Sequence, residues 1–306
     1  MGPTPLSSAR PARKPAKARE DRPLAGLLIM CGAVLCFTGI DSSAKWLILS
    51  GLPPLQVVFA RYAGHFLASL AVFLPGEGVQ AFRSRNARLQ FLRSSLLLGS
   101  TALNFTALSY LPITVTTTIF FAGPIFVSLL SIPILGERVG IRRLAAVVVG
   151  FFGVLVVIQP WGAEFHPAMF LSLGAMSCAS LYFVLTRLLA GTESNATSQL
   201  WSSGLATAAF LPFALTNWVW PETVTGYVVL TVIGGFGALG HSLVTVAHRL
   251  ADASVLAPVV YLQMLFATVA GIVIFATLPT IWTLVGALII VGAGVYIWAR
   301  ERQLKQ

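Results

Sequence analysis

The sequence predicts an all-α membrane protein, in which ten transmembrane helices form two inverted five-helix repeats around a central cavity. Three observations support this class. Hydrophobic residues make up 57% of the 306 residues and charged residues 10%, which is more apolar side chain than one soluble core can bury. The apolar residues are collected in runs of about 20, the length that a helix needs to cross a bilayer. A long part of the chain also occurs twice in similar form.

The duplicated stretch covers residues 107–144 and 247–284, which align at a constant shift of 140 residues (247 − 107). Each copy consists of a short polar turn, a long apolar run, a second turn and the start of another apolar run. This order is typical of a helical hairpin in a membrane. Upstream the similarity continues at a shift of 142 residues (178 − 36), at which Cys36 aligns with Cys178.

These shifts predict two homologous halves, residues 24–160 and residues 167–300, joined near His166. Residues 1–23 are rich in Arg, Lys, Pro and Ala, and such a segment is too polar to pack, so we expect a disordered cytoplasmic tail. Residues 301–306 form a second, short cytoplasmic tail.

The apolar runs place five spans in each half. They fall approximately at residues 24–45, 53–74, 91–110, 113–135, 142–159, 167–189, 197–219, 224–246, 253–276 and 280–300. Because five is an odd number, the second half enters the membrane from the opposite side to the first. The repeat is therefore an inverted one, as in many secondary carriers.

The Lys and Arg residues indicate the orientation of the chain. With the N-terminus in the cytoplasm, all but two of the 20 belong to the tails or to cytoplasmic loops, and Arg93 is counted among the loop charges. The two others, Lys45 and Arg61, fall within or at the end of spans. The opposite loops contain Glu164 and Glu222 and no Lys or Arg, so the positive-inside rule places both termini in the cytoplasm. The net charge of +10 is thus a topology signal and does not indicate a nucleic-acid partner.

Several short motifs stand at the ends of the spans. They are Leu111 and Pro112 before an apolar span, Gly136, Glu137 and Arg138 after it, Ala44 and Lys45 at the end of the first span, and Leu52, Pro53, Pro54, Phe59, Ala60, Arg61 and Tyr62 in the second. In order and spacing, these motifs resemble the EamA-type transporters of the drug/metabolite transporter superfamily over roughly residues 24 to 300. The second half has Ala276, Thr277 and Leu278 where the first has Gly136, Glu137 and Arg138, so no symmetrical role is expected for that turn.

The resemblance implies a carrier of small metabolites in the bacterial inner membrane. Members of the family export amino acids or related compounds, and other members take up vitamins or nucleoside-like molecules. The residues of this sequence do not decide between these substrates.

Charged side chains inside spans are functional candidates, because each costs about 2.5–3.5 kcal/mol on insertion scales. Asp41 and Lys45 are four residues apart in the first span, as are Arg61 and His65 in the second, so each pair lies on one helix face. In a structural interpretation, Asp41 and Lys45 neutralise each other and Arg61 fixes a contact within the bundle. In a functional interpretation, Arg61 and His65 bind a carboxylate-bearing or otherwise polar metabolite, and Asp41 with Lys45 couples transport to protons. His65 is the other group of this set that is able to exchange a proton.

Two uncharged polar residues also lie in apolar surroundings. Asn104 is in the third span and Gln263 in the ninth, and each needs hydrogen-bond partners there. A neighbouring helix or a bound ligand can supply those partners, and both residues are candidates for substrate binding.

Proline residues predict kinks in both copies of the repeated stretch. Pro124 follows Gly123 in the fourth span, and Pro258 lies early in the ninth. Proline removes a backbone donor and bends a helix, and interrupted helices at corresponding positions of two halves indicate a central binding site. Phe120 and Tyr261 lie beside these positions, where they offer flat apolar walls to a ligand or pack against neighbouring helices.

The sequence disfavours other classes of membrane protein. It has no Walker-type phosphate loop and no HExxH or GxSxG pattern, so neither ATP-driven transport nor an intramembrane enzyme is expected. Asp41 is the one acid deep in a span, which argues against a carboxylate-pair protease. Filter-like loops and rings of charge, the usual features of channels, are missing.

We therefore expect a secondary carrier of a small polar or amphiphilic metabolite, amino-acid-like and carboxylate-bearing, that exports its substrate with proton coupling. The alternative is an uptake carrier for a vitamin or a nucleoside-like metabolite. No catalytic residue, cofactor or metal is expected, because His241 and His248 have no carboxylate or cysteine near them. The expected partners are the small-molecule substrate and the lipid bilayer, and the oligomeric state is not specified by the residues.

Overall fold

The computed structural model describes residues 22–135, 141–159, 162, 165–189, 192–251 and 256–303. Within these ranges every regular element is a helix. The predicted all-α class is confirmed. The number of membrane crossings and the inverted relation of the two halves stay predictions, and the turn at Gly136, Glu137 and Arg138 lies outside the described residues.

The helices follow one another in the order of the predicted spans. In the first half they are α1 (Pro23–Leu49), α2 (Pro54–Glu77), the short 3₁₀ helix η1 (Gly78–Phe82), α3 (Ala87–Leu108), α4 (Ile113–Phe120), α5 (Gly123–Leu135) and α6 (Ile141–Ile158). In the second half they are α7 (Met169–Leu189), α8 (Asn195–Thr216), α9 (Val224–Leu250), the 3₁₀ helix η2 (Ala257–Tyr261), α11 (Leu262–Phe275) and α12 (Ile281–Gln303).

Polar side chains at the turns fix where three of these helices begin. Asn86, Ser194 and Thr223 stand directly before α3, α8 and α9, and each accepts a hydrogen bond from the backbone N–H three residues further on. Such caps satisfy a backbone donor that the helix itself leaves unpaired. They therefore define the ends of the helices at the edges of the apolar layer.

Several helices can cross a membrane by length and composition. Among the described residues, five segments are long and apolar enough: Leu24–Leu49, Pro54–Phe82, Ile113–Ile134, Met169–Thr186 and Val224–Val244. Shorter apolar helices cover Ala145–Ile158, Val259–Phe275 and Ile281–Tyr296. Both α3 and α8 carry polar residues on their buried faces, including Thr101 and Asn104 on α3 and Ser202 and Ser203 on α8. These two helices therefore present polar groups to the inside of the bundle.

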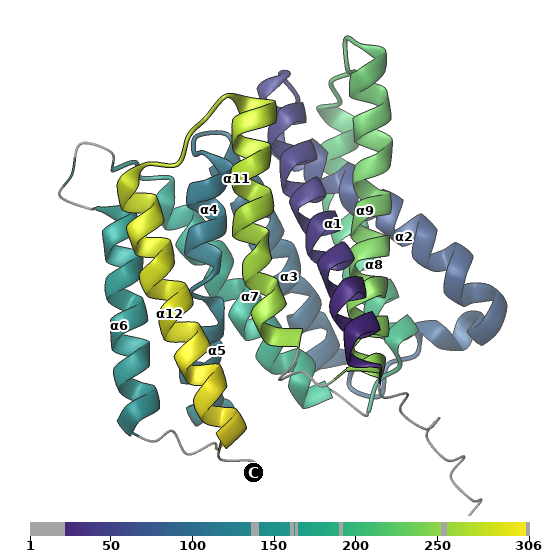
Figure 1. Ribbon diagram of the computed structural model, residues 1–306. Coiled ribbons are helices and arrows are strands. Elements are labelled where there is room, and N and C mark those ends of the chain that lie inside the picture. The colour runs from purple at the N-terminus through teal and green to yellow at the C-terminus, as the bar shows by residue number, and fades with distance from the viewer. Residues whose placement is uncertain are drawn as a thin grey trace, which may run out of the picture.

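The bundle is held together mainly by contacts between the two halves. α1 packs on α9, and α7 packs on α3. α2 packs on both α8 and α9, and α8 also packs on α3. α6 packs on α12. Figure 1 shows α6 and α12 side by side at one edge and running in opposite directions, with the N-terminal end of α1 and the C-terminal end of α12 at the same end of the bundle. A movement of one half against the other must therefore change most of the packing.

Both spans that were predicted to kink are interrupted. α4 ends at Phe120, a turn follows at Phe121 and Ala122, and α5 begins at Gly123. The corresponding part of the second half starts as η2, which contains Pro258, and becomes α-helical only in α11. At the first interruption, the Gly123 carbonyl accepts a hydrogen bond from the Ser180 hydroxyl at 3.3 Å.

Candidate functional site

Four polar residues from three helices of the first half form one group, which we call the polar cluster: Asp41 on α1, Arg61 on α2, and Thr101 and Asn104 on α3. Asn104 Nδ2 donates to Asp41 Oδ1 at 3.1 Å, and Arg61 Nη1 donates to Thr101 Oγ1 at 3.3 Å. Thr101 and Asn104 are three residues apart and so lie on one face of α3. The opposite charges of Asp41 and Arg61 attract each other, so three of the predicted site residues, Asp41, Arg61 and Asn104, come together.

Three residues of the polar cluster are buried and Asp41 is partly buried, and the cluster still offers hydrogen-bonding atoms. Arg61 is 6% exposed and Asn104 8%. Within the cluster, Arg61 Nε and Asn104 Oδ1 have no hydrogen-bond partner among the described residues. Leaving such buried atoms unpaired costs about 1–3 kcal/mol each, and native proteins do so rarely. The cluster can therefore give a ligand a charged donor and an amide acceptor.

Lys45 makes different contacts from those that the sequence suggested. Its Nζ donates to the backbone carbonyls of Leu108 at 3.2 Å and Leu111 at 2.6 Å, and it lies 5.6 Å from the centre of the Phe275 ring. The first carbonyl is at the C-terminal end of α3, where a cation is favourable because of the helix dipole. Lys45 thus holds the end of α3, and mutual neutralisation with Asp41 is not what the structure shows.

His65 stacks on a second histidine that belongs to the other half of the chain. The ring centres of His65 on α2 and His241 on α9 are 5.5 Å apart at an interplanar angle of 13°, and Phe37 of α1 meets His241 edge-on at 5.2 Å. Sequence reasoning gave His241 no role. A signal existed, because the shift of 140 residues places His241 at the position of Thr101 in the first half (241 − 140). We call His65 and His241 the His pair.

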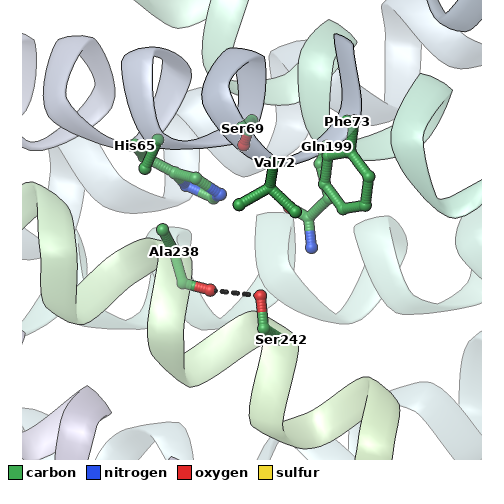
Figure 2. A pocket seen from close by; sticks show the side chains of 8 residues that line it. His65, Ser69, Val72, Phe73, Gln199, Ala238 and Ser242 are labelled. Atoms are coloured by element: carbon green, nitrogen blue, oxygen red, sulfur yellow. Dashed lines mark hydrogen bonds between the residues drawn. The ribbon is translucent and has the colours of Figure 1, made fainter. Parts of the chain in front are cut away.

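A small pocket lies beside the His pair, between α2, α8 and α9. Its lining includes His65, Ser69, Gln199 and Ser242, and the space within it for water-sized molecules is about 20 Å³. Figure 2 shows His65 and Val72 on α2 facing α9, where the Ser242 hydroxyl donates to the Ala238 carbonyl at 2.7 Å. Ligand sites for drug-sized molecules usually measure about 300–1,000 Å³, so this pocket admits only a small group.

The predicted aromatic residues form a separate group around the interruption between α4 and α5. Phe120 and Tyr261 are partly buried and pack on the same apolar core, and Phe121 meets Tyr261 edge-on at 5.4 Å. The Tyr261 hydroxyl lies against Gly294 on α12. Gln263 is partly exposed on α11. Within the described part of the chain, no hydrogen bond or ring contact joins this group to the polar cluster, but α11 packs on both α1 and α4.

Comparison with known proteins decides the family. The model of the EamA-like transporter family matches residues 24–159 and again residues 166–299. The chain belongs to the EamA-like transporter family. It is therefore a multi-pass membrane protein, and a transporter of small metabolites rather than an enzyme.

Relatives with curated names are transporters as well. A riboflavin transporter of Vibrio cholerae is 28% identical, with 94% of this chain and 98% of the relative covered. An S-adenosylmethionine uptake transporter of Rickettsia prowazekii is 30% identical, with 81% and 84% covered. A pseudopaline exporter of Pseudomonas aeruginosa is 24% identical, with 88% and 94% covered. A crystal structure that covers 93% of this chain has a TM-score of 0.62 at 18% identity, a likeness of fold.

Arg93 is the functional candidate of this transporter that sequence reasoning misplaced. It was counted among the loop charges, but α3 begins six residues before it and it is only 4% exposed. Its Nε donates to Thr186 Oγ1 at 2.7 Å, its Nη2 to the Tyr182 hydroxyl at 2.9 Å and its Nη1 to Ser202 Oγ at 3.2 Å. The partners lie on α7 and α8, so Arg93 joins the first half to the second.

Further hydrogen bonds join the halves of the transporter near both ends of the bundle. At the end that holds Arg93, Glu193 accepts from the Ser84 hydroxyl at 2.7 Å and from the Asn86 N–H at 2.9 Å. At the opposite end, where α2 begins, the Gln56 amide donates to the Val219 carbonyl at 2.7 Å and accepts from the Val219 N–H at 2.9 Å. Each end thus has its own contacts between the halves.

Proposed function

We propose that this chain is a secondary carrier that moves a small amino-acid-like metabolite across the bacterial inner membrane by alternating access. The observation that carries the proposal is the buried Arg61 beside Asp41, two opposite charges whose surroundings keep a donor and an acceptor unpaired. Charged groups inside a membrane bundle usually mark a substrate or ion pathway. A zwitterionic amino acid matches this arrangement, because its carboxylate suits Arg61 and its ammonium group suits Asp41.

The geometry of each group supports a specific role in substrate binding. Arg61 presents a planar fork that matches a carboxylate, and one of its nitrogens, Nε, is unpaired. Asn104 both holds Asp41 and keeps its own carbonyl oxygen unpaired. The aromatic pair Phe120 and Tyr261, on the helices that pack next to α1, offers flat surfaces on which a ring of the substrate can lie. His65 and Gln263 remain proposed substrate contacts.

The names of the relatives fit such a substrate. S-adenosylmethionine, which appears in the name of one relative, is an amino acid with a flat nitrogen heterocycle, and riboflavin, named in another, has the heterocycle without the carboxylate. A vitamin such as riboflavin is therefore the second candidate. One relative is named for uptake and another for export, and we propose uptake, because the uptake carrier is 30% identical and the exporter 24%.

Alternating access needs two halves that can rock around a shared site. Three observations support the inverted repeat that this mechanism uses. The family model matches the chain twice. The packing between the halves is paired, so that α1 on α9 corresponds to α7 on α3. α6 and α12 run in opposite directions side by side (Figure 1).

Orientation of the carrier follows from the Lys and Arg bias and is tested by labelling. We expect both termini in the cytoplasm, with the turn at Asn86 inside and the turn at Glu222 outside. A single cysteine at Glu222 should react with an impermeant maleimide added to intact cells, and a cysteine at Asn86 should not. Labelling at Asn86 alone would show that the predicted topology is inverted.

Substrate counterflow in proteoliposomes tests the function itself. The purified full chain, with unlabelled S-adenosylmethionine inside, should draw in the labelled compound, and an empty liposome should not. Replacing a charged hydrogen-bonding partner removes about 1.5–3 kcal/mol, so Arg61→Ala should weaken the apparent affinity by about 10- to 150-fold. Arg61→Lys keeps the charge but not the fork and should fall between Arg61→Ala and the wild type. Arg85→Ala, at an exposed loop position, is the matched control.

The outcome also separates the two candidate substrates. Counterflow of riboflavin but not of S-adenosylmethionine would favour the vitamin carrier. An unchanged affinity in Arg61→Ala would remove Arg61 from the binding site. Asp41 stays the carboxylate predicted to take part in proton coupling, whereas Lys45 is already bonded to two backbone carbonyls.

A further inference from the structure

The His pair consists of one titratable side chain from each half of the carrier, and the two side chains are in contact. His65 belongs to the first half and His241 to the second, and their rings stack at 5.5 Å. Close packing of the backbones brings them together, because α2 and α9 approach each other at Gly64 and Gly234, one residue before His65 and seven before His241. Any movement that separates α2 from α9 therefore separates the two imidazoles.

Charged groups on two helices, α2 and α3, act on the His pair, and a carboxylate on α1 acts on one of them. Arg61 lies one turn before His65 on α2 and interacts with both imidazoles, and Arg93 of α3 interacts with His241. Asp41 of α1 attracts Arg61. α8 contributes the neutral Gln199 and α9 the neutral Ser242 to the adjoining pocket, and Phe37 of α1 covers the edge of His241.

These surroundings allow the His pair at most one proton. Two imidazolium ions at 5.5 Å in a poorly screened interior repel each other strongly. Burial of the rings opposes the first proton, and so does repulsion from Arg61. A substrate carboxylate bound to Arg61 cancels that repulsion. Substrate and proton then strengthen each other's binding, and by linkage the effect is reciprocal.

We infer that the His pair is the proton-binding site that couples this carrier to a proton gradient, one proton being taken up with each carboxylate-bearing substrate. The proton binds at Nδ1 of His65, the ring nitrogen that has no hydrogen-bond partner among the described residues although His65 is 2% exposed. It leaves to water when the halves move apart and the stack opens. This inference rests on the proposed function, since it uses a carboxylate at Arg61.

The test uses the full chain in proteoliposomes that contain a pH-sensitive dye, with S-adenosylmethionine as the probe and the membrane potential clamped by potassium and valinomycin. Counterflow without a gradient measures the carrier. Accumulation under an inside-alkaline gradient, together with acidification of the lumen, measures coupling. With one proton per substrate, a gradient of one pH unit supports up to about tenfold accumulation in the wild type.

His241→Gln should keep counterflow, lose gradient-driven accumulation and no longer acidify the lumen, and His65→Gln should likewise lose accumulation and acidification. His166→Gln changes a histidine at an exposed position outside the pair and should behave as the wild type. Gly234→Ala forces α2 and α9 apart while keeping both imidazoles, so it should uncouple transport as well, and Gly235→Ala, which meets no atom within 4 Å, should not. If a histidine variant fails to fold, these two glycine variants still test whether the His pair couples transport to protons.

Full gradient-driven accumulation in both histidine variants would overturn the inference. So would normal coupling in them together with loss of coupling in Asp41→Asn, since the proton would then sit on Asp41. If the wild type shows no counterflow of S-adenosylmethionine, the proposed function is wrong, and the inference that rests on it is wrong as well. The counterflow and gradient assays thus distinguish a wrong substrate from a wrong proton site.

Discussion

Replacing Gly234 with alanine should force apart the two helices that carry the His pair. A Cβ atom at this position would lie 2.6 Å from the Gly64 Cα, 2.9 Å from the Gly64 carbonyl carbon and 3.0 Å from the His65 nitrogen. All three are backbone atoms of α2, so none of them can rotate away as the end of a side chain can. The neighbouring Gly235 has no atom within 4 Å of its own Cβ position and is the matched control.

The expected size of the effect follows from these distances. The optimal separation of non-bonded carbon atoms is about 3.5–4.0 Å, so α2 and α9 must move apart by about 1 Å. Overpacking of this kind costs about 1–3 kcal/mol. Replacing glycine with alanine inside a helix stabilises the folded state by about 0.5–1 kcal/mol, and this stabilisation is the same in both variants. The difference between Gly234→Ala and Gly235→Ala therefore measures the cost of the crossing alone.

Thermal unfolding of the purified protein measures this difference, and the seven tryptophans supply the fluorescence. At about 2 °C per kcal/mol for a chain of this size, Gly234→Ala should melt about 2–6 °C below Gly235→Ala. Equal melting temperatures would show that α2 and α9 do not meet at this point, and the stacking of His65 on His241 would lose its support. Equal gradient-driven accumulation in the two variants would leave only the stability argument standing.

Two other substitutions test further contacts. Lys45→Met should leave two backbone carbonyls unpaired, one at the end of α3 and one in the turn after it, at about 1–3 kcal/mol each. It should therefore lower the melting temperature, and Lys45→Arg should restore part of the loss. Gly294→Ala places a methyl group on the Tyr261 hydroxyl and should weaken S-adenosylmethionine counterflow if that ring lines the substrate path. Gly292→Ala, with nothing within 4 Å, should leave counterflow unchanged, and equal effects of the two glycine variants would exclude Tyr261.

The centre of the candidate site could be predicted because charge stands out in an apolar run. Asp41, Arg61 and Asn104 were each singled out as polar groups inside spans. In the structure a hydrogen bond joins Asn104 to Asp41, electrostatic attraction joins Asp41 to Arg61, and Arg61 donates to the neighbouring Thr101. Interrupted helices were predictable for a similar reason, because proline cannot donate the backbone hydrogen bond that an unbroken helix needs. Both features are local, so a single sequence contains them.

Contacts between helices depend on register, which a single sequence does not specify. His241 was visible as a histidine in the eighth span, but its stacking on His65 depends on where α2 crosses α9. The close approach of Gly64 and Gly234 sets that crossing, and glycines are too frequent in this chain, 27 of 306 residues, to single out one pair. The group of Phe120 and Tyr261 illustrates the same limit, since both lie on one apolar core rather than against the polar cluster.

Arg93 shows how a cation near the end of an apolar run can be misread. A cation in a loop and a cation buried near the start of a helix have the same sequence surroundings. Arg93 is known to be of the second kind only because α3 begins at Ala87. Within the described part of the chain Arg93 has no carboxylate partner, and all its acceptors are hydroxyl groups or a backbone carbonyl on α7 and α8. Hydrogen bonds from an ionised guanidinium to neutral acceptors are charge-assisted, but breaking them leaves no second buried charge unpaired, as the separation of an ion pair does. Under the proposed alternating access, Arg93 can therefore hold the two halves together at one end and release them when water replaces its partners.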